Sequence, residues 1–418
     1  GRVHRTVGQG RSFAKMVRSR WPLEAMIDHA DDTHPDVRRM LVPIGPVAVF
    51  GASNFPLAFS VPGGDTASAL AAGCPVVVKG HPAHPITSEI AGVALSKAVE
   101  EAGAPAGTFS LIQGSGVAVG EALVTEPGIA AVGFTGSLRG GRSLHDLAAS
   151  RENPIPVFAE MGSLNPVFVT EQALESRAEA IAEGLVGSIT LGTGQFCTKP
   201  GLVFIPPSWV ERFSRLVAER LASIGPAPML TPAIRDAFVA RVDGSASLEG
   251  VSQMVLPNPD GVEGISCAPA LLSTDLDRFL SHDDLIEEHF GPMTILVATP
   301  GNRIDEAIAG LPGSLTVTVH GEQADIDELG ETYRDLTQIA GRVIWNGFPT
   351  GVAVVPSMHH GGPYPSTTNS QHTSVGMTAV RRFLRPVAFQ GAPNELLPPG
   401  LRDDNPWGLR RLVDWAWE

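Results

Sequence analysis

Short apolar runs alternate with amphipathic stretches along most of the chain from residue 43 onward. A first series of apolar runs predicts strands at 47–50, 76–79, 109–112, 130–134 and 157–160. Helical stretches separate them, at 65–72, 88–101, 116–124 and 140–149. Parallel strands need a crossover connection, which is commonly a helix, so this alternation predicts a parallel, doubly wound sheet of the Rossmann-like kind.

A second series of the same kind follows. It predicts helices at 172–190, 208–223, 303–310 and 323–337, and strands at 202–205, 294–297, 315–320 and 343–345. Residues 224–266 are polar and show no clear period, so we expect them to be irregular. The two series predict an α/β protein with two doubly wound domains and a cleft between them, and 418 residues are enough for two or three domains.

Acidic residues outnumber basic ones, 44 to 30, which leaves a formal net charge of −14. An acidic surface repels phosphate backbones and anionic lipids, so nucleic acid and membrane surfaces are excluded as main partners. No stretch approaches the roughly 18 uncharged apolar residues that a membrane span needs. The expected partner is therefore a small molecule.

The three cysteines, Cys74, Cys197 and Cys267, are too few for a disulfide framework, and their spacing gives no zinc pattern. We therefore expect no metal and a reducing compartment, which is the cytoplasm. In such a compartment one of the three can be a reactive thiol.

Residues 1–20 carry six basic side chains and no acid, a composition shared with mitochondrial transit peptides. The alternative is a helix of the folded protein. Phe13, Met16, Val17 and Trp21 fall on one helical face, which favours that alternative because such a face packs against a domain.

Cys197 lies in the sequence Gly194-Gln195-Phe196-Cys197-Thr198, between a long predicted helix and the strand at 202–205. Loops held by a rigid sheet are where catalytic side chains concentrate. Most buried cysteines are inert packing residues, and Cys74 and Cys267 fit that interpretation. Cys197 becomes the candidate nucleophile only because other segments agree with it.

Two polar residues follow predicted strands of the first series. Glu160 ends the strand at 157–160, where it is placed to act as a general base; the alternatives are a helix cap and a surface acid. Asn54 follows the strand at 47–50 and offers an amide donor to a developing oxyanion; the alternative is a turn-forming asparagine before Phe55-Pro56.

A glycine-rich loop follows the strand at 130–134 and opens the next helix. Backbone amides at a helix N-terminus, together with the Ser137 hydroxyl, can bind a pyrophosphate. The spacing of its glycines is not that of the G-x-G-x-x-G fingerprint, so the loop alone does not identify a dinucleotide site.

In this order and spacing, these four segments resemble the aldehyde dehydrogenase superfamily over about residues 43–390. The resemblance implies Cys197 as nucleophile, Glu160 as general base and Asn54 as oxyanion donor. It also implies a set of residues that bind a nicotinamide dinucleotide, namely Lys79, Phe134, Thr135, Gly136, Ser137, Gly141, Glu288 and Phe290.

Within that superfamily the chain is most similar to the 2-oxoglutarate semialdehyde (2,5-dioxopentanoate) dehydrogenase branch. The similarity rests on segments such as residues 64–73, 346–351 and 358–365. The branch implies NADP or NAD as cofactor, with NADP favoured. It also resembles fatty aldehyde dehydrogenases, in which the histidine of H-G-G-P-Y-P lies near the nucleophile. His360 is therefore a candidate proton relay or thiolate-tuning group, and the alternative is a histidine that orders the loop.

The resemblance implies oxidation of an aldehyde to a carboxylic acid through a cysteine thiohemiacetal and a thioester. Two alternatives stay open. The substrate can be a fatty or other aldehyde, or the chain can be a non-catalytic cofactor-binding or structural protein.

The expected domains follow the superfamily plan. Residues 1–21 and 43–160 form the dinucleotide-binding domain, whose N-terminal part we expect to be missing, and residues 161–375 form the catalytic domain. Residues 22–42 and 376–395 form an oligomerisation hairpin and strand, and 396–418 a C-terminal tail. This small β flap implies a homodimer or homotetramer.

Overall fold

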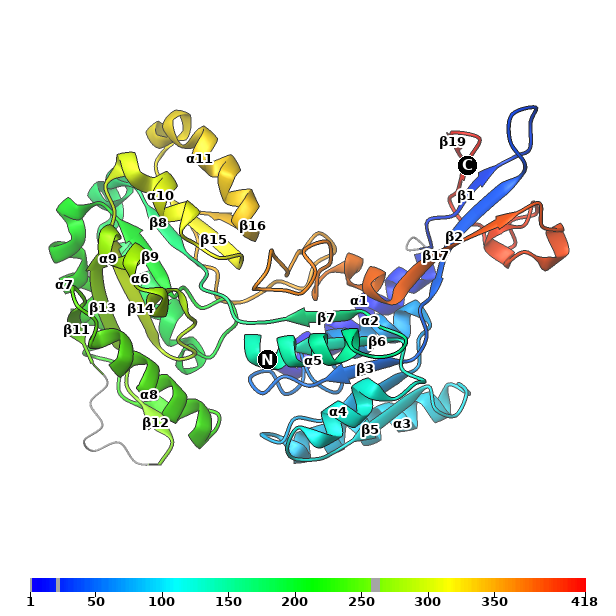
Figure 1. Cartoon of the computed structure of the whole chain (residues 1–418), viewed down its shortest axis with the longest axis horizontal. Helices are drawn as coiled ribbons and strands as arrows, with labels where there is room; N and C mark the ends of the chain where they lie inside the picture. Colours follow the sequence, from blue (N-terminus) through cyan, green and yellow to red (C-terminus); the bar gives the residue numbers. More distant parts are fainter. Residues whose placement is uncertain (1, 20–22, 257–263) are drawn as a thin grey trace.

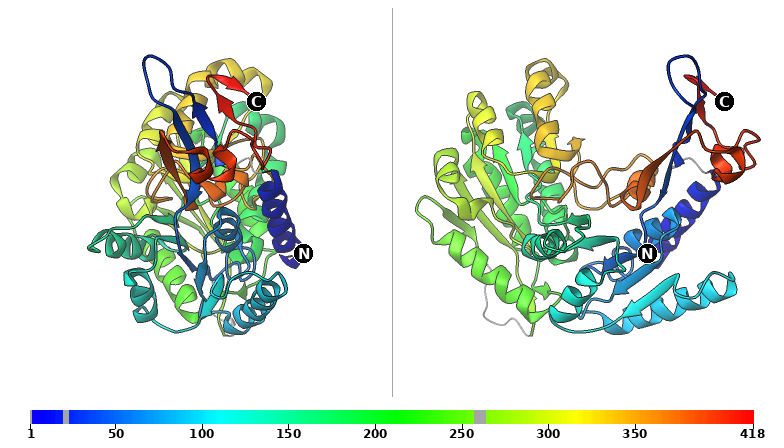
Figure 2. Two further views of the ribbon diagram at one scale, coloured as in Figure 1. Left: turned by 90° about the vertical axis from the view of Figure 1, so that its right-hand side faces the viewer. Right: turned by 45° about the vertical axis from the view of Figure 1, so that its right-hand side comes forward.

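The computed structural model describes residues 2–19, 23–256 and 264–418. The chain forms two α/β lobes, each around its own sheet, and a small third sheet that projects from the first lobe (Figures 1 and 2). A fourth sheet pairs two strands, β10 (Ala227–Pro228) and β12 (Ser266–Cys267). In the part of the chain that is described, no helix combines the length and the apolar character that crossing a bilayer requires.

The first lobe contains the predicted parallel sheet, in the order β5-β4-β3-β6-β7. Its strands are β3 (Val47–Phe50), β4 (Val76–Lys79), β5 (Phe109–Ile112), β6 (Ala131–Thr135) and β7 (Val157–Glu160). Its helices are α2 (Gly64–Ala72), α3 (Pro85–Glu101), α4 (Ala118–Thr125) and α5 (Leu138–Ala149). Every strand pair is parallel, and Phe50, Lys79, Thr135 and Glu160 lie at one edge of the sheet.

The second lobe holds a seven-stranded sheet in the order β11-β13-β14-β9-β8-β15-β16, parallel except for β11. Its strands are β8 (Val167–Val169), β9 (Leu202–Ile205), β11 (Ser252–Val255), β13 (Ala270–Asp275), β14 (Met293–Ala298), β15 (Ser314–His320) and β16 (Ala340–Trp345). Its helices are α6 (Glu171–Thr190), α7 (Val210–Leu221), α8 (Pro232–Ala246), α9 (Leu276–Ser281), α10 (Ile304–Ala309) and α11 (Ile326–Ile339). The predicted α/β fold class is confirmed.

The expectation that residues 224–266 are irregular is wrong where the structure describes them. This segment contains β10, α8, β11 and the first residue of β12. The Thr231 hydroxyl accepts the Ile234 N–H and so caps α8, and Phe238 and Val242, one turn apart, are buried in the core. The apolar residues of α8 are spread around the helix rather than gathered on one face, so the sequence shows little helical periodicity. Residues 257–263 lie outside the described part.

The third sheet has the order β17-β2-β1-β18-β19. It consists of β1 (Met26–Asp28), β2 (Val37–Pro43), β17 (Leu384–Gln390), β18 (Leu412–Val413) and β19 (Ala416–Trp417). Residues 377–383, which we expected to begin a strand, form the 3-10 helix η7 (Met377–Phe383) instead. The segment expected as a tail adds β18 and β19 to the sheet, next to β1.

The N-terminal segment is the helix α1 (Arg2–Ser19), which packs on α2 and η7. Phe13 and Met16 are buried there, as the apolar face predicts, but Val17 is 44% exposed because it turns away from that contact. Trp21 lies outside the described residues. The helix therefore belongs to the first lobe.

Candidate active site

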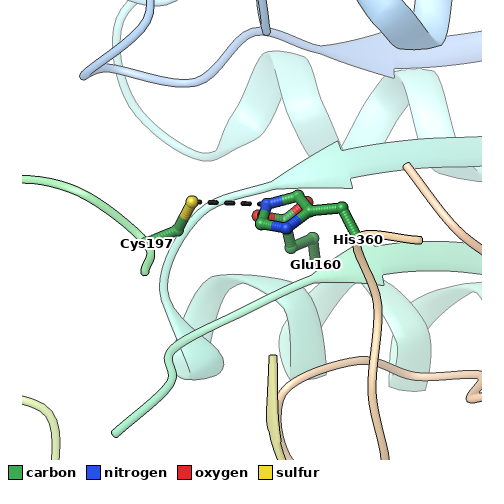
Figure 3. Close-up of side chains that lie close together, drawn as sticks. All are labelled: Glu160, Cys197 and His360. Atoms are coloured by element: carbon green, nitrogen blue, oxygen red, sulfur yellow. Dashed lines mark hydrogen bonds and ion pairs between the residues drawn. The ribbon is translucent and has the colours of Figure 1, made fainter. Parts of the chain in front are cut away.

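Three of the four predicted catalytic side chains converge where the two lobes meet (Figure 3). Glu160 ends β7, Cys197 follows the short 3-10 helix η2 (Leu191–Gly194), and His360 lies in the long loop between β16 and η7. The Cys197 Sγ is 3.4 Å from the His360 Nε2, and the same Nε2 is 2.8 Å from the Glu160 Oε1. A thiol, an imidazole and a carboxylate thus share one contact point.

The Cys197 thiol is held in its neutral form by its surroundings. Burial raises its pKa well above the usual value, and the nearby Glu160 carboxylate raises it further. The thiolate is the reactive form, so a proton acceptor in contact with the sulfur has a chemical task here. His360 and Glu160 are the two groups placed for it.

Glu160 remains a carboxylate despite being buried. Burial alone would raise its pKa, but the neighbouring His360 and a hydrogen bond from the Ser374 hydroxyl, at 2.5 Å, bring the pKa below the usual value. The sequence analysis did not identify Ser374. It lies in a loop without a motif, and only the fold brings it to the end of β7.

Asn54, in the segment that follows β3, contacts the nucleophile loop, residues 195–201 between η2 and β9, which carries Cys197. Its Nδ2 donates to the Gln195 carbonyl, two residues before Cys197, at 3.0 Å. An amide nitrogen carries two hydrogens, so one remains for a substrate oxygen. This contact places the Asn54 amide beside the loop that carries the nucleophile.

A second asparagine, which the sequence analysis did not identify, also hydrogen-bonds the nucleophile loop. The buried Asn165 Nδ2 donates to the carbonyls of Cys197 and Lys199, at 2.9 and 3.0 Å. Asn165 has a φ of 51°, a left-handed conformation that asparagine tolerates better than most residues. The sequence signal that could have identified Asn165 is its position before Pro166, shortly after the strand that ends at Glu160.

The predicted cofactor residues of the first lobe lie at the carboxyl ends of its strands, where dinucleotides bind in open α/β sheets. They are Lys79 at the end of β4, Phe134 and Thr135 at the end of β6, and Gly136, Ser137 and Gly141 at the start of α5. The Ser137 hydroxyl accepts the Gly140 N–H and so caps α5. A Cβ on Gly141 would lie 2.5 Å from the Met161 sulfur, so this glycine permits the helix to pack on β7.

These residues fit a phosphorylated dinucleotide. The Lys79 side chain is buried, has no carboxylate within ion-pair distance among the described residues, and has a pKa lowered by burial. The Thr135 hydroxyl is buried without a hydrogen-bond partner in the same part of the chain. A ligand with acceptor oxygens at this edge would satisfy both groups.

Glu288 and Phe290 approach from the second lobe. A Cβ on Gly162 would lie 2.7 Å from a Glu288 carboxylate oxygen, so this glycine lets Glu288 come close to the end of β7. Burial raises the pKa of Glu288 to about 7 and lowers that of the neighbouring Lys199 to about 8. Phe290, two residues on, is half-buried. The sequence analysis did not identify Lys199, whose Nζ donates to the Met293 carbonyl.

The ligand atoms of Glu160, Cys197 and His360 lie within 4.8 Å of one another, so this set could also hold a metal ion. Nucleophilic catalysis needs the same proximity between a thiol and its proton acceptor. The same geometry therefore suits either chemistry.

A family model described as "Aldehyde dehydrogenase family" matches residues 1–383. The chain is 46% identical to alpha-ketoglutaric semialdehyde dehydrogenase 2 of Azospirillum brasilense, over 99% of this chain and 80% of that protein. It is 43% identical to alpha-ketoglutaric semialdehyde dehydrogenase of Acinetobacter baylyi, with the same coverage of both chains.

Solved structures share the fold at lower identity. The glyceraldehyde-3-phosphate dehydrogenase GapN of Methanocaldococcus jannaschii, complexed with NADP, matches with a TM-score of 0.78 at 18% identity, over 93% of this chain and 80% of that one. The aldehyde dehydrogenase AldC of Pseudomonas syringae, complexed with NAD⁺ and octanal, matches with a TM-score of 0.75 at 23% identity, over 93% and 77%.

Proposed function

We propose that this chain, which belongs to the aldehyde dehydrogenase family, oxidises 2-oxoglutarate semialdehyde. The product is 2-oxoglutarate. The NAD(P)-dependent oxidation of an aldehyde is the family's reaction. Two relatives that are 43% and 46% identical over nearly the whole chain are named for this substrate, under its other name alpha-ketoglutaric semialdehyde. The observation that carries the chemistry is the contact of the Cys197 thiol with His360 beside Glu160.

In the first half-reaction Cys197 attacks the aldehyde carbon. Its proton passes to His360 or Glu160, the C–S bond forms, and the carbonyl electron pair moves to oxygen. The free Asn54 N–H and the Cys197 backbone N–H stabilise that oxyanion. Losing one such donor commonly costs roughly 10²–10³ in kcat.

The residues that would hold the nicotinamide dinucleotide are Lys79, the start of α5 at Ser137, and Glu288. When bound, the nicotinamide supplies the acceptor for the hydride that leaves the thiohemiacetal carbon. The acyl group then remains on the Cys197 sulfur as a thioester. Glu160 takes a proton from water, the water oxygen attacks the acyl carbon, and the Cys197 sulfur leaves.

We infer that NADP is the preferred cofactor from the resemblance to the semialdehyde dehydrogenase branch. The residues after β4 contribute little positive charge toward a 2′-phosphate. Burial lowers the pKa of His81 to about 4, so it is neutral at pH 7, and Lys79 is the cation placed there. Comparing kcat/KM for NADP⁺ and NAD⁺ tests this preference.

The test of the substrate is NAD(P)H formation across an aldehyde panel with each cofactor. We expect a higher kcat/KM on 2,5-dioxopentanoate than on decanal. The reverse order would favour a fatty aldehyde dehydrogenase. No NAD(P)H from any aldehyde, together with normal binding of the cofactor, would favour a non-catalytic binding protein.

We also infer an assembly of two or four copies and a cytoplasmic location. Trp415 and Trp417 are exposed on the small third sheet, where apolar side chains suit an interface between subunits. Cys74, Cys197 and Cys267 are all free thiols, which supports a reducing compartment.

A further inference from the structure

Two arginines near the active site have no carboxylate partner. The fully buried arginines of the described chain all form ion pairs: Arg38 with Asp36 and Asp403, Arg382 with Asp65, and Arg411 with Glu418. Arg5 and Arg342 are half-buried, and no carboxylate in the described ranges lies within 4.0 Å of either. A desolvated cation without a counter-ion is costly, so its retention needs a reason.

Arg5 reaches the site from α1. Its guanidinium carbon is 5.8 Å from the Phe55 ring centre and 5.7 Å from that of Phe59, and its buried Nε has no hydrogen-bond partner among the described residues. The Phe55 ring packs edge-on against Phe196, at 5.0 Å, and the Phe59 ring is 6.1 Å from that of His360. A single ring, that of Phe55 or Phe59, therefore lies between Arg5 and the neighbours of Cys197, which are Phe196 and His360.

Arg342 reaches the same apolar cluster from β16. Its guanidinium donates to the Pro349 carbonyl at 2.8 Å and contacts the Met358 sulfur, and its Nε has no partner in the part of the chain that is described. Met358 packs with Phe55 and Phe59 in one cluster. The two arginines thus approach one apolar cluster from two lobes of the protein.

The electrostatics connect both arginines to the nucleophile. Burial lowers the pKa of Arg5 and of Arg342, and a negative Cys197 opposes that effect in each case. Arginine stays charged in proteins despite such shifts. The site therefore holds two partly desolvated positive charges within electrostatic reach of Cys197, in a chain whose net charge is −14.

We propose that Arg5 and Arg342 bind the carboxylate end of the substrate while its aldehyde carbon lies at Cys197. This inference rests on the proposed function and specifies its substrate class: a short aldehyde with an anionic group at the other end. Guanidinium groups hold carboxylates by paired hydrogen bonds, and the adjacent keto oxygen of a 2-oxo acid is a further acceptor. The Phe55 and Phe196 rings suit the methylene groups between the two ends.

The test compares 2,5-dioxopentanoate with pentanal, an uncharged aldehyde of the same number of carbons. In Arg5→Gln and Arg342→Gln we expect kcat/KM for 2,5-dioxopentanoate to fall roughly 10- to 100-fold, mainly through KM, because each variant loses hydrogen bonds to a charged group. For pentanal we expect kcat/KM within about twofold of wild type. The Lys variants should regain part of the loss, because the charge returns without the planar fork.

The control is Arg215→Gln, which removes an exposed arginine that pairs with Glu211 on α7. We expect it to leave both substrates unaffected. A parallel loss on both aldehydes in the Arg5 or Arg342 variants would assign them a structural role and overturn the proposal. An unchanged kcat/KM for 2,5-dioxopentanoate would overturn it as well.

A binding measurement separates this inference from the proposed activity. Calorimetric titration with 2-oxoglutarate does not require turnover. We expect the double variant Arg5→Gln/Arg342→Gln to bind 2-oxoglutarate roughly 10- to 100-fold more weakly than wild type does. If wild type oxidises no aldehyde and the double variant still binds 2-oxoglutarate more weakly than wild type, the proposed function is contradicted and the anion site is supported. Equal binding by the two proteins would contradict the anion site.

Discussion

At the scale of single residues, the arrangement around Cys197 explains how a thiol with a raised pKa can still react. The sulfur touches His360, and His360 touches a carboxylate that remains charged. A proton can therefore leave the thiol without crossing open space. The groups that accept the proton are already oriented by the fold, so forming the thiolate requires no rearrangement of them.

Replacing Glu160 by Gln should separate the two half-reactions. The amide cannot take a proton from water, so the thioester should accumulate on Cys197. We expect a burst of NAD(P)H of about one equivalent per site, followed by slow turnover, in rapid-mixing absorbance measurements. A uniform loss without a burst would instead make Glu160 the activator of the thiol.

Replacing His360 by Asn tests whether this histidine tunes the thiol. Because burial and Glu160 raise the pKa of Cys197, losing the contact with Nε2 should move thiolate formation to higher pH. We expect iodoacetamide to label Cys197 more slowly at neutral pH and to recover as the pH rises, with turnover reduced roughly 10²-fold. An unchanged labelling profile, measured by mass spectrometry of the Cys197 peptide, would leave His360 only the role of ordering its loop.

Residues next to strand ends and within motifs could be predicted from the sequence, because local pattern and position carry their signal. Cys197, Glu160 and Asn54 are of this kind. Ser374, Lys199 and Arg5 are not, because each reaches the site through packing between segments far apart in the chain. Arg5 in particular is one of several basic residues on α1, and only the fold separates it from the others.

At the scale of elements, the strands of the first lobe were predictable because they are short apolar runs between clear turns. Their predicted bounds match β3, β4, β5 and β7. In the second lobe the pattern was less informative. Neither the strand β13 nor the helix α8 was predicted. The helix α8 was missed because tertiary contacts with the core stabilise it more than its own periodicity indicates.

The end of β15 makes stability sensitive to pH. Burial lowers the pKa of His320 to about 4, helped by Arg177, and neither ring nitrogen has a hydrogen-bond partner in the described chain. Below the unfolded pKa of about 6.5, the unfolded chain binds a proton at this histidine and the folded chain does not. Lowering the pH therefore reduces the free energy of unfolding, by up to about 3 kcal/mol from this residue.

We therefore expect His320→Leu to gain thermal stability relative to wild type as the pH is lowered from 7 to 5. Scanning calorimetry at each pH measures the difference in Tm. The matched control is His4→Leu, an exposed histidine of α1, which should keep the wild-type pH dependence. Parallel pH dependences for wild type and His320→Leu would contradict the assignment.

At the scale of the whole molecule, the two lobes carry different parts of the chemistry. In the proposed mechanism the first lobe supplies Glu160 as general base, Asn54 as oxyanion donor and the strand ends suited to a dinucleotide. The second lobe supplies Cys197 as nucleophile and Glu288. The third sheet lies at the side of the first lobe that faces away from the second lobe (Figure 1), and it exposes Trp415 by 90% and Trp417 by 61%. The addition of β18 and β19 to this sheet was not predicted.

We expect light scattering to give a dimer or a tetramer rather than the 43.9 kDa monomer at micromolar concentration. Trp415→Asp together with Trp417→Asp should weaken that assembly, because a charge on each position opposes burial. Ile86→Asp, at an equally exposed apolar position on α3, is the control and should not change the mass. A monomeric wild-type protein would contradict the proposed assembly.

The most direct test of the central claim is the rate of NAD(P)H formation from 2,5-dioxopentanoate by wild type and by Cys197→Ser. A serine hydroxyl is a far weaker nucleophile than a thiolate at neutral pH, and the fold should tolerate the exchange. We predict steady NAD(P)H formation by wild type and none above background by Cys197→Ser. Wild-type turnover in Cys197→Ser would contradict the assignment of the nucleophile.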